Sequence, residues 1–191
     1  GLDDYILGGD EAKKFMSSVR FRQSAKDQVT LYEPPHKGFS VKFPGTPTYV
    51  SEVRNDKSRH EWIATDSHGN AYAIFRTNLH HYDYIEEDTF DLSLVEESFT
   101  HSSFIGKKLS RKFIEWKGYP ALDGEYRHND GSTLRARYIL QGNNYYVLLA
   151  KYKKAETLTP FFESFTITPF QYGDAKNRVD SSMGFTVKSP V

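Results

Sequence analysis

Hydrophobic and polar residues alternate along most of the sequence, which is typical of β-strands with one face in a core. The first half of the chain contains four such segments, at residues 39–43, 47–54, 60–66 and 71–79. Pro44 and Gly45 close the first segment, and the triplet HGN at 68–70 marks a tight turn between the last two. The pattern therefore predicts short strands, of which the last two form a hairpin.

The spacing of apolar residues becomes helical after residue 87. One helical face carries Phe90, Leu94, Val95 and Phe99. Asp88 is a suitable N-cap for this helix, and Gly106 is the residue at which it is expected to stop. We expect the helix to cover one face of the sheet.

Strand-like alternation resumes after the helix, at residues 107–116, 120–128, 132–141 and 145–152. The triplets NDG at 129–131 and GNN at 142–144 are strong turn signals, so these strands are expected to form an antiparallel meander. A short helix near Pro160, within 155–162, and a last strand at 163–168 follow. The whole pattern predicts an α+β fold in which an antiparallel β-sheet packs against helices.

The chain also contains an internal repeat. The heptamer GFSVKFP at 38–44 recurs as GFTVKSP at 184–190, an offset of 146 residues. At the same offset, FMSSVRF at 15–21 lies over FFESFTI at 161–167, more weakly. A tandem array with a period near 146 residues explains both matches, and chance similarity between amphipathic segments is the alternative.

The repeat divides the chain into five parts. They are the C-terminal tail of a preceding repeat unit (1–21), a linker (22–37), a complete domain (38–170), a second linker (171–183) and the first strand of a following unit (184–191). The two linkers are polar and contain proline or glycine. We expect the two end segments to pack on the central domain or to pair with a neighbouring molecule.

Composition and charge exclude several classes of protein. The 25 basic residues balance the 25 acidic ones, which disfavours binding to nucleic acid. Aromatic residues make up 15% of the chain, too many for a disordered protein. The absence of cysteine excludes disulfide scaffolds, thiolate metal sites and cysteine nucleophiles. No apolar run is long enough to span a membrane, so membrane attachment is expected only through an anchor outside this fragment.

The order of these segments resembles the PsbP-like family. The resemblance runs from GFSVKFPGTP through one hairpin and one long helix to WKGYPALDGEYRHNDGSTLRARYILQGNNYYVLLAKY and a closing FFESFTI, over about residues 38–168. It implies an α/β/α sandwich. It also implies a non-enzymatic module that is often extracytoplasmic, in the periplasm or at the cell surface, and that works through protein contacts. PsbP itself is a subunit of the photosynthetic oxygen-evolving complex. No residue of this chain maps onto a functional motif of the family, so that role is not expected here.

The densest polar segment is HHYDYIEED at 80–88. His80, His81, Asp83 and Glu86 or Glu87 are the residue types that bind Zn²⁺, Mn²⁺ or Ca²⁺. However, adjacent histidines in an extended segment point to opposite sides, and neither an HExxH nor a DxDxDG spacing is present. The alternative is a solvated loop whose acidic residues favour the helix N-terminus.

Two groups of residues are candidates for a binding face on the meander. The first consists of the aromatic residues Tyr126, Tyr138, Tyr145 and Tyr146, although core packing accounts for most aromatic residues at alternating strand positions. The second consists of Arg135 and Arg137 together with the basic cluster Lys107, Lys108, Arg111 and Lys112. These residues would bind an acidic partner or a phosphate. The alternative is that they are the charged residues of a solvated sheet face. His128, Asp130 and Ser132 lie too close together, beside a tight turn, to reach the geometry of a catalytic triad.

Three interpretations of function follow. The first is a non-enzymatic binding or scaffold module, one unit of a tandem-repeat extracytoplasmic protein, which contacts a protein partner and neighbouring repeat units and needs no cofactor. The second is a metal-dependent hydrolase or metal-binding domain centred on residues 80–88. The third is a module that binds a small ligand or glycan between sheet and helix, which a sizeable tyrosine-lined pocket would favour.

Overall fold

The structure is a computed structural model, and it describes residues 29–35, 37–54, 57–78, 87–153, 159–169, 174–180 and 184–189. Its strands are β1 (Val29–Tyr32), β2 (Phe39–Pro44), β3 (Thr48–Arg54), β4 (Lys57–Thr65), β5 (Ala71–Asn78), β6 (Ile105–Trp116), β7 (Tyr119–His128), β8 (Thr133–Gln141), β9 (Asn144–Tyr152), β10 (Thr166–Ile167), β11 (Lys176–Asp180) and β12 (Phe185–Ser189). Its helices are α3 (Asp88–Thr100) and α4 (Thr159–Ser164).

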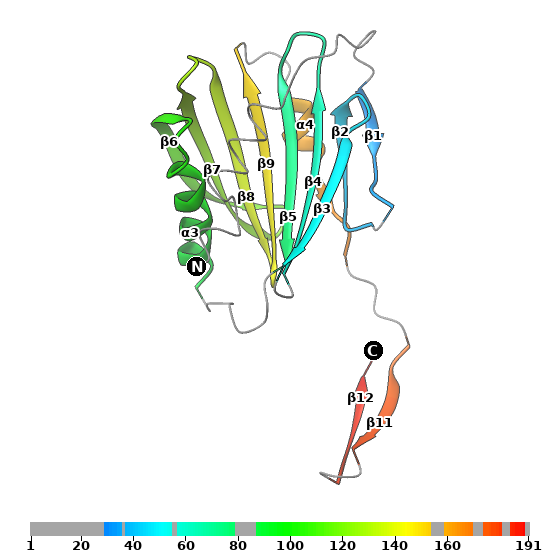
Figure 1. Cartoon of the computed structure of the whole chain (residues 1–191). Coiled ribbons are helices and arrows are strands. Elements are labelled where there is room, and N and C mark those ends of the chain that lie inside the picture. The colour runs from blue at the N-terminus through cyan, green and yellow to red at the C-terminus, as the bar shows by residue number, and fades with distance from the viewer. Residues whose placement is uncertain are drawn as a thin grey trace.

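Seven strands form one antiparallel sheet in the order β3-β4-β5-β9-β8-β7-β6 (Figure 1). The predicted strands of this sheet are confirmed, each to within a few residues, as is the order of the meander β6 to β9. The contact between β5 and β9 joins the two halves of the sheet, with Ala71 opposite Lys151 and Asn78 opposite Asn144. This pairing between distant segments makes β9 the central strand.

The tight turns lie where the sequence signals them. Gly131 and Gly142 have φ angles of 85° and 55°, a backbone region that glycine adopts at little cost. At the turn between β4 and β5, the Asp66 carboxylate accepts hydrogen bonds from the Asn70 backbone N–H at 2.8 Å and the Tyr72 hydroxyl at 3.0 Å. These contacts hold the register of the hairpin.

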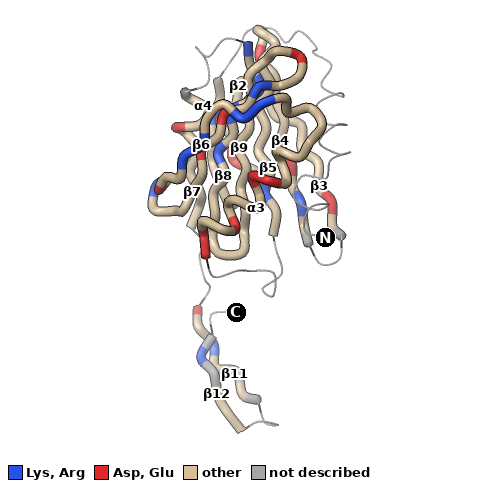
Figure 2. Tube along the Cα trace, turned by 90° about the vertical axis from the view of Figure 1, so that its left-hand side faces the viewer, with Lys and Arg blue, Asp and Glu red and all other residues tan. Residues whose placement is uncertain are grey.

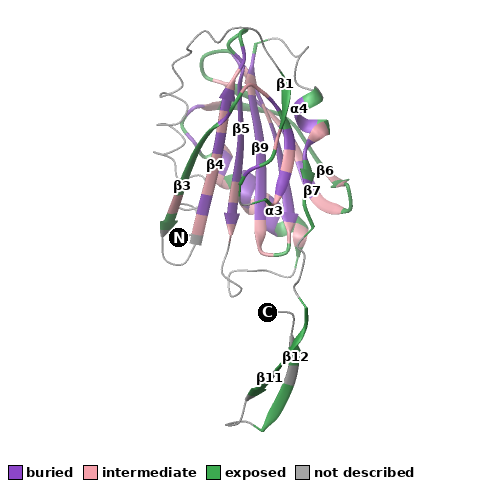
Figure 3. Ribbon diagram, turned by 90° about the vertical axis from the view of Figure 1, so that its right-hand side faces the viewer, coloured by how far each residue is buried: buried purple, intermediate pink, exposed green. Residues whose placement is uncertain are grey.

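Both faces of the seven-stranded sheet are covered, so the alternating side chains build two cores. On one face, Leu92, Val95 and Phe99 of α3 pack on residues of the sheet. On the other face lie α4 and a three-stranded sheet of order β1-β2-β10, whose Phe39, Val41 and Phe43 are buried (Figures 1 and 3). The predicted α+β class with an antiparallel sheet is confirmed, and its second covering layer is mixed strand and helix.

Helix α3 begins at Asp88, so the N-cap is Glu87 and not Asp88 as predicted, one residue away. The helix ends at Thr100, so Gly106 does not stop it and lies instead in β6. Phe90, expected on the buried face, is 47% exposed. The residues that face the sheet are Asp91, Leu92, Val95, Glu96 and Phe99. The buried face is therefore rotated relative to the predicted one, because the sheet rather than the helix alone selects it. None of the helices in the described part of the chain is long and apolar enough to cross a membrane.

Strand β1 lies within the segment 22–37, which its polar residues and prolines predict to be a linker. It pairs antiparallel with β2, from Val29 opposite Pro44 to Tyr32 opposite Val41. The Tyr32 ring meets the Phe43 ring edge-on at 5.9 Å. The strand forms because β2 offers it a free edge and an aromatic contact, neither of which is visible in the local sequence.

The second predicted linker, 171–183, contains strand β11, and β12 lies in the segment 184–191 expected to begin a following unit. The two strands pair with each other as an antiparallel hairpin. In Figures 1 and 3 this hairpin stands apart from the main body and is exposed. Residues 1–21, the expected tail of a preceding unit, lie outside the described residues.

Candidate functional site

The expected metal ligands His80, His81, Asp83 and Glu86 lie outside the described residues. Within the part of the chain that the structure describes, no group of three or more His, Asp or Glu side chains is arranged to hold a metal ion. The metal site at residues 80–88 therefore stays a prediction.

The tyrosines of the predicted binding face are core residues. Tyr126, Tyr138, Tyr145 and Tyr146 are each 3% exposed or less. The first three belong to the core beneath α3, and Tyr146 belongs to the opposite core. The prediction of an exposed tyrosine face is wrong because both sheet faces are covered, so alternate side chains of these strands all point into one core or the other.

The two arginines of that face support the sheet opposite α3. Arg137 is 3% exposed and donates two hydrogen bonds to the Asp123 carboxylate, at 2.6 and 2.7 Å. Its guanidinium lies over the Trp116 ring at 3.9 Å, and that of Arg135 lies over the Phe162 ring at 4.5 Å. The bidentate and cation–π contacts hold Arg137 against the sheet, although its Nη1 has no hydrogen-bond partner among the described residues. Arg135 is less tightly held, with its Nη2 3.6 Å from Asp123 Oδ2.

Helix α3 is attached to the sheet by a buried carboxylate. Glu96 is 2% exposed and accepts hydrogen bonds from Lys108 Nζ at 2.7 Å, Arg111 Nε at 2.6 Å and the Tyr126 hydroxyl at 3.0 Å. The Tyr138 hydroxyl in turn donates to the Tyr126 hydroxyl at 3.2 Å. Residues of two strands, β6 and β7, thus bind one carboxylate of α3, and β8 joins the network through Tyr126.

The electrostatics of this network favour a structural role. Burial by itself raises the pKa of Glu96, but hydrogen bonds from Lys108, Arg111 and Tyr126 outweigh it, so the pKa lies below its ordinary value. Burial also raises the pKa of Tyr126 and of Tyr138, which keeps both phenols protonated as donors. Because a general acid or base works best with a pKa near the operating pH, this network is suited to holding α3 rather than to proton transfer.

Glu96 is not among the residues that the sequence singles out, although its position carries a signal. It lies four residues after Leu92 and three before Phe99, both of which are buried. An acidic residue on the apolar face of a helix predicts buried basic or hydroxyl partners on the element beneath it.

His128, Asp130 and Ser132 are close in space at the turn between β7 and β8, but they do not form a triad. The Ser132 hydroxyl donates to Asp130 Oδ1 at 2.5 Å, and Lys151 Nζ lies 2.7 Å from the other carboxylate oxygen. His128 Nδ1 accepts a hydrogen bond from the Asp130 backbone N–H at 3.0 Å. The hydroxyl is directed at a carboxylate instead of at the imidazole, so the contact between base and nucleophile is missing.

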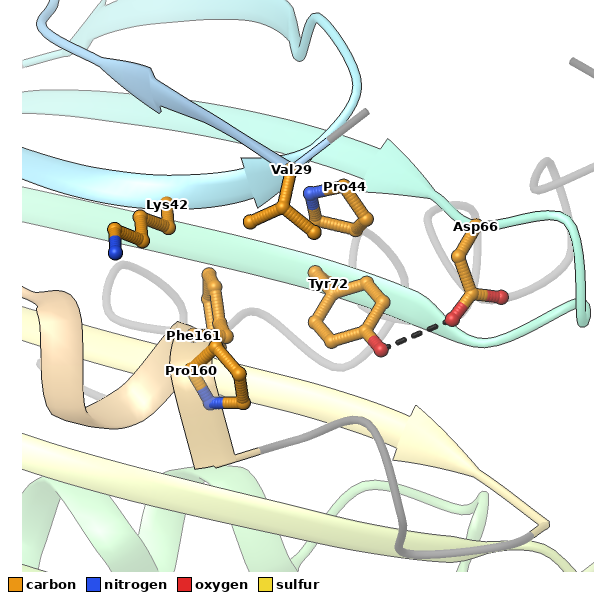
Figure 4. A pocket seen from close by; sticks show the side chains of 7 residues that line it. All are labelled: Val29, Lys42, Pro44, Asp66, Tyr72, Pro160 and Phe161. Atoms are coloured by element: carbon orange, nitrogen blue, oxygen red, sulfur yellow. Dashed lines mark hydrogen bonds between the residues drawn. The ribbon is translucent and has the colours of Figure 1, made fainter. Parts of the chain in front are cut away.

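A small cavity lies between the hairpin β1–β2 and α4 (Figure 4). It is lined by Val29, Lys42, Pro44, Asp66, Tyr72, Pro160 and Phe161. Its volume is about 60 Å³, whereas ligand pockets usually hold about 300–1,000 Å³. Only one tyrosine lines it, and its hydroxyl is already bound to Asp66. The cavity therefore does not favour a small-ligand or glycan site.

Strand β6 is the most exposed long element of the body. It is one of the two end strands of the seven-stranded sheet, β3 being the other, and in the described part of the chain no strand pairs with its outer edge. Its twelve residues are exposed or half-buried, and the apolar side chains of Leu109 and Phe113 are 41% and 38% exposed. Figure 2 shows the Lys and Arg residues that follow this edge of the sheet.

The positive charge of β6 is only partly neutralised. Lys108 and Arg111 bind Glu96, but Lys107 and Lys112 have no carboxylate within ion-pair distance among the described residues. Lys107 lies opposite Arg127 in the register, and like charges in such a pair repel. Lys112 lies opposite Asp123 in the register, although not within ion-pair distance of it. The outer edge of β6 thus combines exposed apolar side chains with lysines that form no ion pair among the described residues.

No protein-family model and no curated protein matches the sequence. The structure is similar to the solution structure of cyanobacterial PsbP from Synechocystis, with 10% sequence identity and a TM-score of 0.46. The match covers 78% of this chain and 98% of that one.

Proposed function

We propose that the protein is a non-enzymatic binding or scaffold module, one unit of a tandem array in an extracytoplasmic protein, and that it binds a protein partner along β6. The observation that carries the proposal is the twelve-residue outer edge of β6, exposed and incompletely neutralised. The extracytoplasmic setting comes from the family that the sequence resembles.

The edge fits one class of partner, an extended acidic segment. Such a segment would add to the sheet as an eighth strand and pair with the outward backbone N–H and C=O groups of β6. Acidic side chains on it would offset the charge of Lys107 and Lys112, and apolar ones would contact Leu109 and Phe113. Charge complementarity would favour this partner over a second basic edge of the same kind.

Binding is also favoured over catalysis by how the polar groups are used. Glu96 and Asp130, the carboxylates whose pKa values are most clearly lowered, are both held in ion pairs with lysine or arginine. Neither has the pKa near neutrality or the free access to a cavity that general acid–base chemistry needs.

The test uses a synthetic peptide of alternating threonine and glutamate as the probe. We expect it to slow hydrogen exchange of the outward amides of β6, with an affinity that falls as salt is added. The Lys107→Ser/Lys112→Ser variant should bind several-fold more weakly. Lys153→Ser, which removes an exposed lysine elsewhere, should bind like the wild type.

Two results would contradict the proposal. One is peptide binding of equal strength in the wild type and the double variant. The other is a wild type that does not bind the peptide while the double variant self-associates, which would mean that the lysines only prevent edge-to-edge pairing.

A further inference from the structure

The hairpin β11–β12 repeats the hairpin β1–β2 in sequence and in pairing register. Strand β2 begins FSVK and β12 begins FTVK, 146 residues later. Three pairs of the first hairpin recur at that offset, namely Thr30↔Phe43 as Lys176↔Ser189, Leu31↔Lys42 as Asn177↔Lys188, and Tyr32↔Val41 as Arg178↔Val187. Because a slip of one residue would reverse the faces of a strand, the shared register means that the two hairpins present equivalent faces.

The turns of the two hairpins agree as well. Gly38 and Gly184, again 146 residues apart, precede the second strand and have φ angles of 105° and 68°. The first strands differ in sequence, TLY against KNR at the paired positions, so the common register is not a consequence of identity in both strands. The repeat therefore extends from a heptamer to a whole supersecondary unit.

The hairpins differ in what covers them. Phe39 in β2 is 1% exposed and packs on the Trp62 ring at 4.8 Å and the Phe165 ring at 5.4 Å. The equivalent residue of β12, Phe185, is 47% exposed. Figure 3 shows the exposed hairpin β11–β12 apart from the body. Strand β12 thus carries an aromatic residue at a position that is buried in β2, but this residue is exposed in β12.

The contacts of β2 indicate which elements would be needed to cover β12. In this chain β2 lies between β1 and β10, and it contacts α4 and β4 on the sheet face below. Thr166 of β10 pairs with Ser40 of β2, the residue equivalent to Thr186 in β12. A partner for β12 must supply an edge strand like β10 and an apolar packing surface like that formed by α4 and β4.

A second copy of this chain fits β12 poorly. Phe43 is 0% exposed and its ring lies 5.4 Å from the ring of Phe161, whereas Ser189 occupies its register position in β12. Arg178 likewise stands where β1 has Tyr32. Exchange of β12 into this body would replace both rings and leave a cavity at the position of Phe43, which disfavours a second copy as the partner.

We propose that β11–β12 is the first hairpin of a following unit, and that the face of β12 carrying Phe185 binds a body of the same fold. That body has a larger side chain than Phe161 opposite Ser189. The inference rests on the tandem-array part of the proposed function and is independent of β6.

The test is a fusion of residues 1–189 to residues 44–191 of a second copy, so that β11–β12 precedes the second body as β1–β2 precedes the first. The fusion carries Arg178→Tyr, Asp180→Pro and Ser189→Phe, which restore the side chains that this particular body accommodates. We expect two folded bodies, with about twice the near-ultraviolet circular dichroism per chain of the 191-residue protein. A fusion that also lacks residues 174–189 should have one.

Matched variants locate the contact. Phe185→Asp should abolish folding of the second body, because the equivalent Phe39 is buried. Val179→Glu should have no effect, because the equivalent residue is the exposed Glu33. In the 191-residue chain neither substitution should change the urea-unfolding midpoint.

Three results would overturn the inference. They are two folded bodies in the fusion that lacks the hairpin, two folded bodies in the Phe185→Asp fusion, or a dimer of the 191-residue chain by light scattering that Phe185→Asp converts to monomer. The last would identify a second copy as the partner. Because β6 lies outside the hairpin, failure here leaves the peptide-binding test unaffected, and failure of that test leaves this one unaffected.

Discussion

Replacement of Glu96 by glutamine tests whether one buried carboxylate holds α3 on the sheet. The variant keeps the shape of the side chain and an oxygen that accepts from Tyr126. It removes the charge that Lys108 and Arg111 bind at 2.7 and 2.6 Å, and it can bring an amide N–H against those donors.

The expected loss of stability follows from the exposure of the partners. Glu96 is almost fully buried, but the side chains of Lys108 and Arg111 are 43% and 34% exposed and can turn to water. Each charge-assisted contact then contributes towards the lower end of its range, so the free energy of unfolding should fall by about 2–3 kcal/mol in total.

The dependence on pH gives a second, independent readout. The pKa of Glu96 is lowered in the folded protein, so its contribution is present above the ordinary glutamate pKa and is lost as pH falls through the folded-state value. Urea unfolding of both proteins, followed by circular dichroism from neutral to acidic pH, should show a gap that closes as the pH falls. Glu97→Gln, on the same helix but with a 62% exposed side chain, should change stability by less than about 0.5 kcal/mol. A gap that is absent at neutral pH, or unchanged in acid, would refute this account of the network.

Three further substitutions are tested by the same urea assay. Gly38→Ala should cost about 1–3 kcal/mol, because φ is 105° and the added Cβ would lie 2.8 Å from a guanidinium nitrogen of Arg76; wild-type stability would contradict this. Asp66→Ala removes the acceptor of four hydrogen bonds at the turn between β4 and β5 and should cost about 2–4 kcal/mol, with Asp66→Asn recovering a part. Phe43→Ser gives β2 the residue of β12 and should cost about 3–5 kcal/mol, whereas Ser189→Phe should leave the midpoint unchanged, and equal effects of the two would show that the hairpins are covered alike.

The sequence by itself determined α3 and the strands of the seven-stranded sheet, with their order along the chain, but not β1 and β11, which lie in segments predicted to be linkers. Alternation over a few residues and turn residues such as Gly131 and Gly142 act locally, so the strands of the meander and the start of α3 are predicted almost to the residue. The internal offset of 146 residues is also local information, because it compares two short segments. Local signals are sufficient where a strand is set by its own pattern and by the turn beside it.

Tertiary structure decided what each face meets. Tyr126 and Tyr146 lie on opposite faces of the sheet, and both are buried. Tyr126 is covered by α3, and Tyr146 by the layer that contains the hairpin β1–β2 and α4. Glu96 became a buried acceptor only when α3 packed on β6 and β7, and β6 became one of two open edges when the strand order was set. Burial and electrostatic partners depend on residues far away in sequence, and this is the physical reason why a local pattern predicts a strand but not what lies against it.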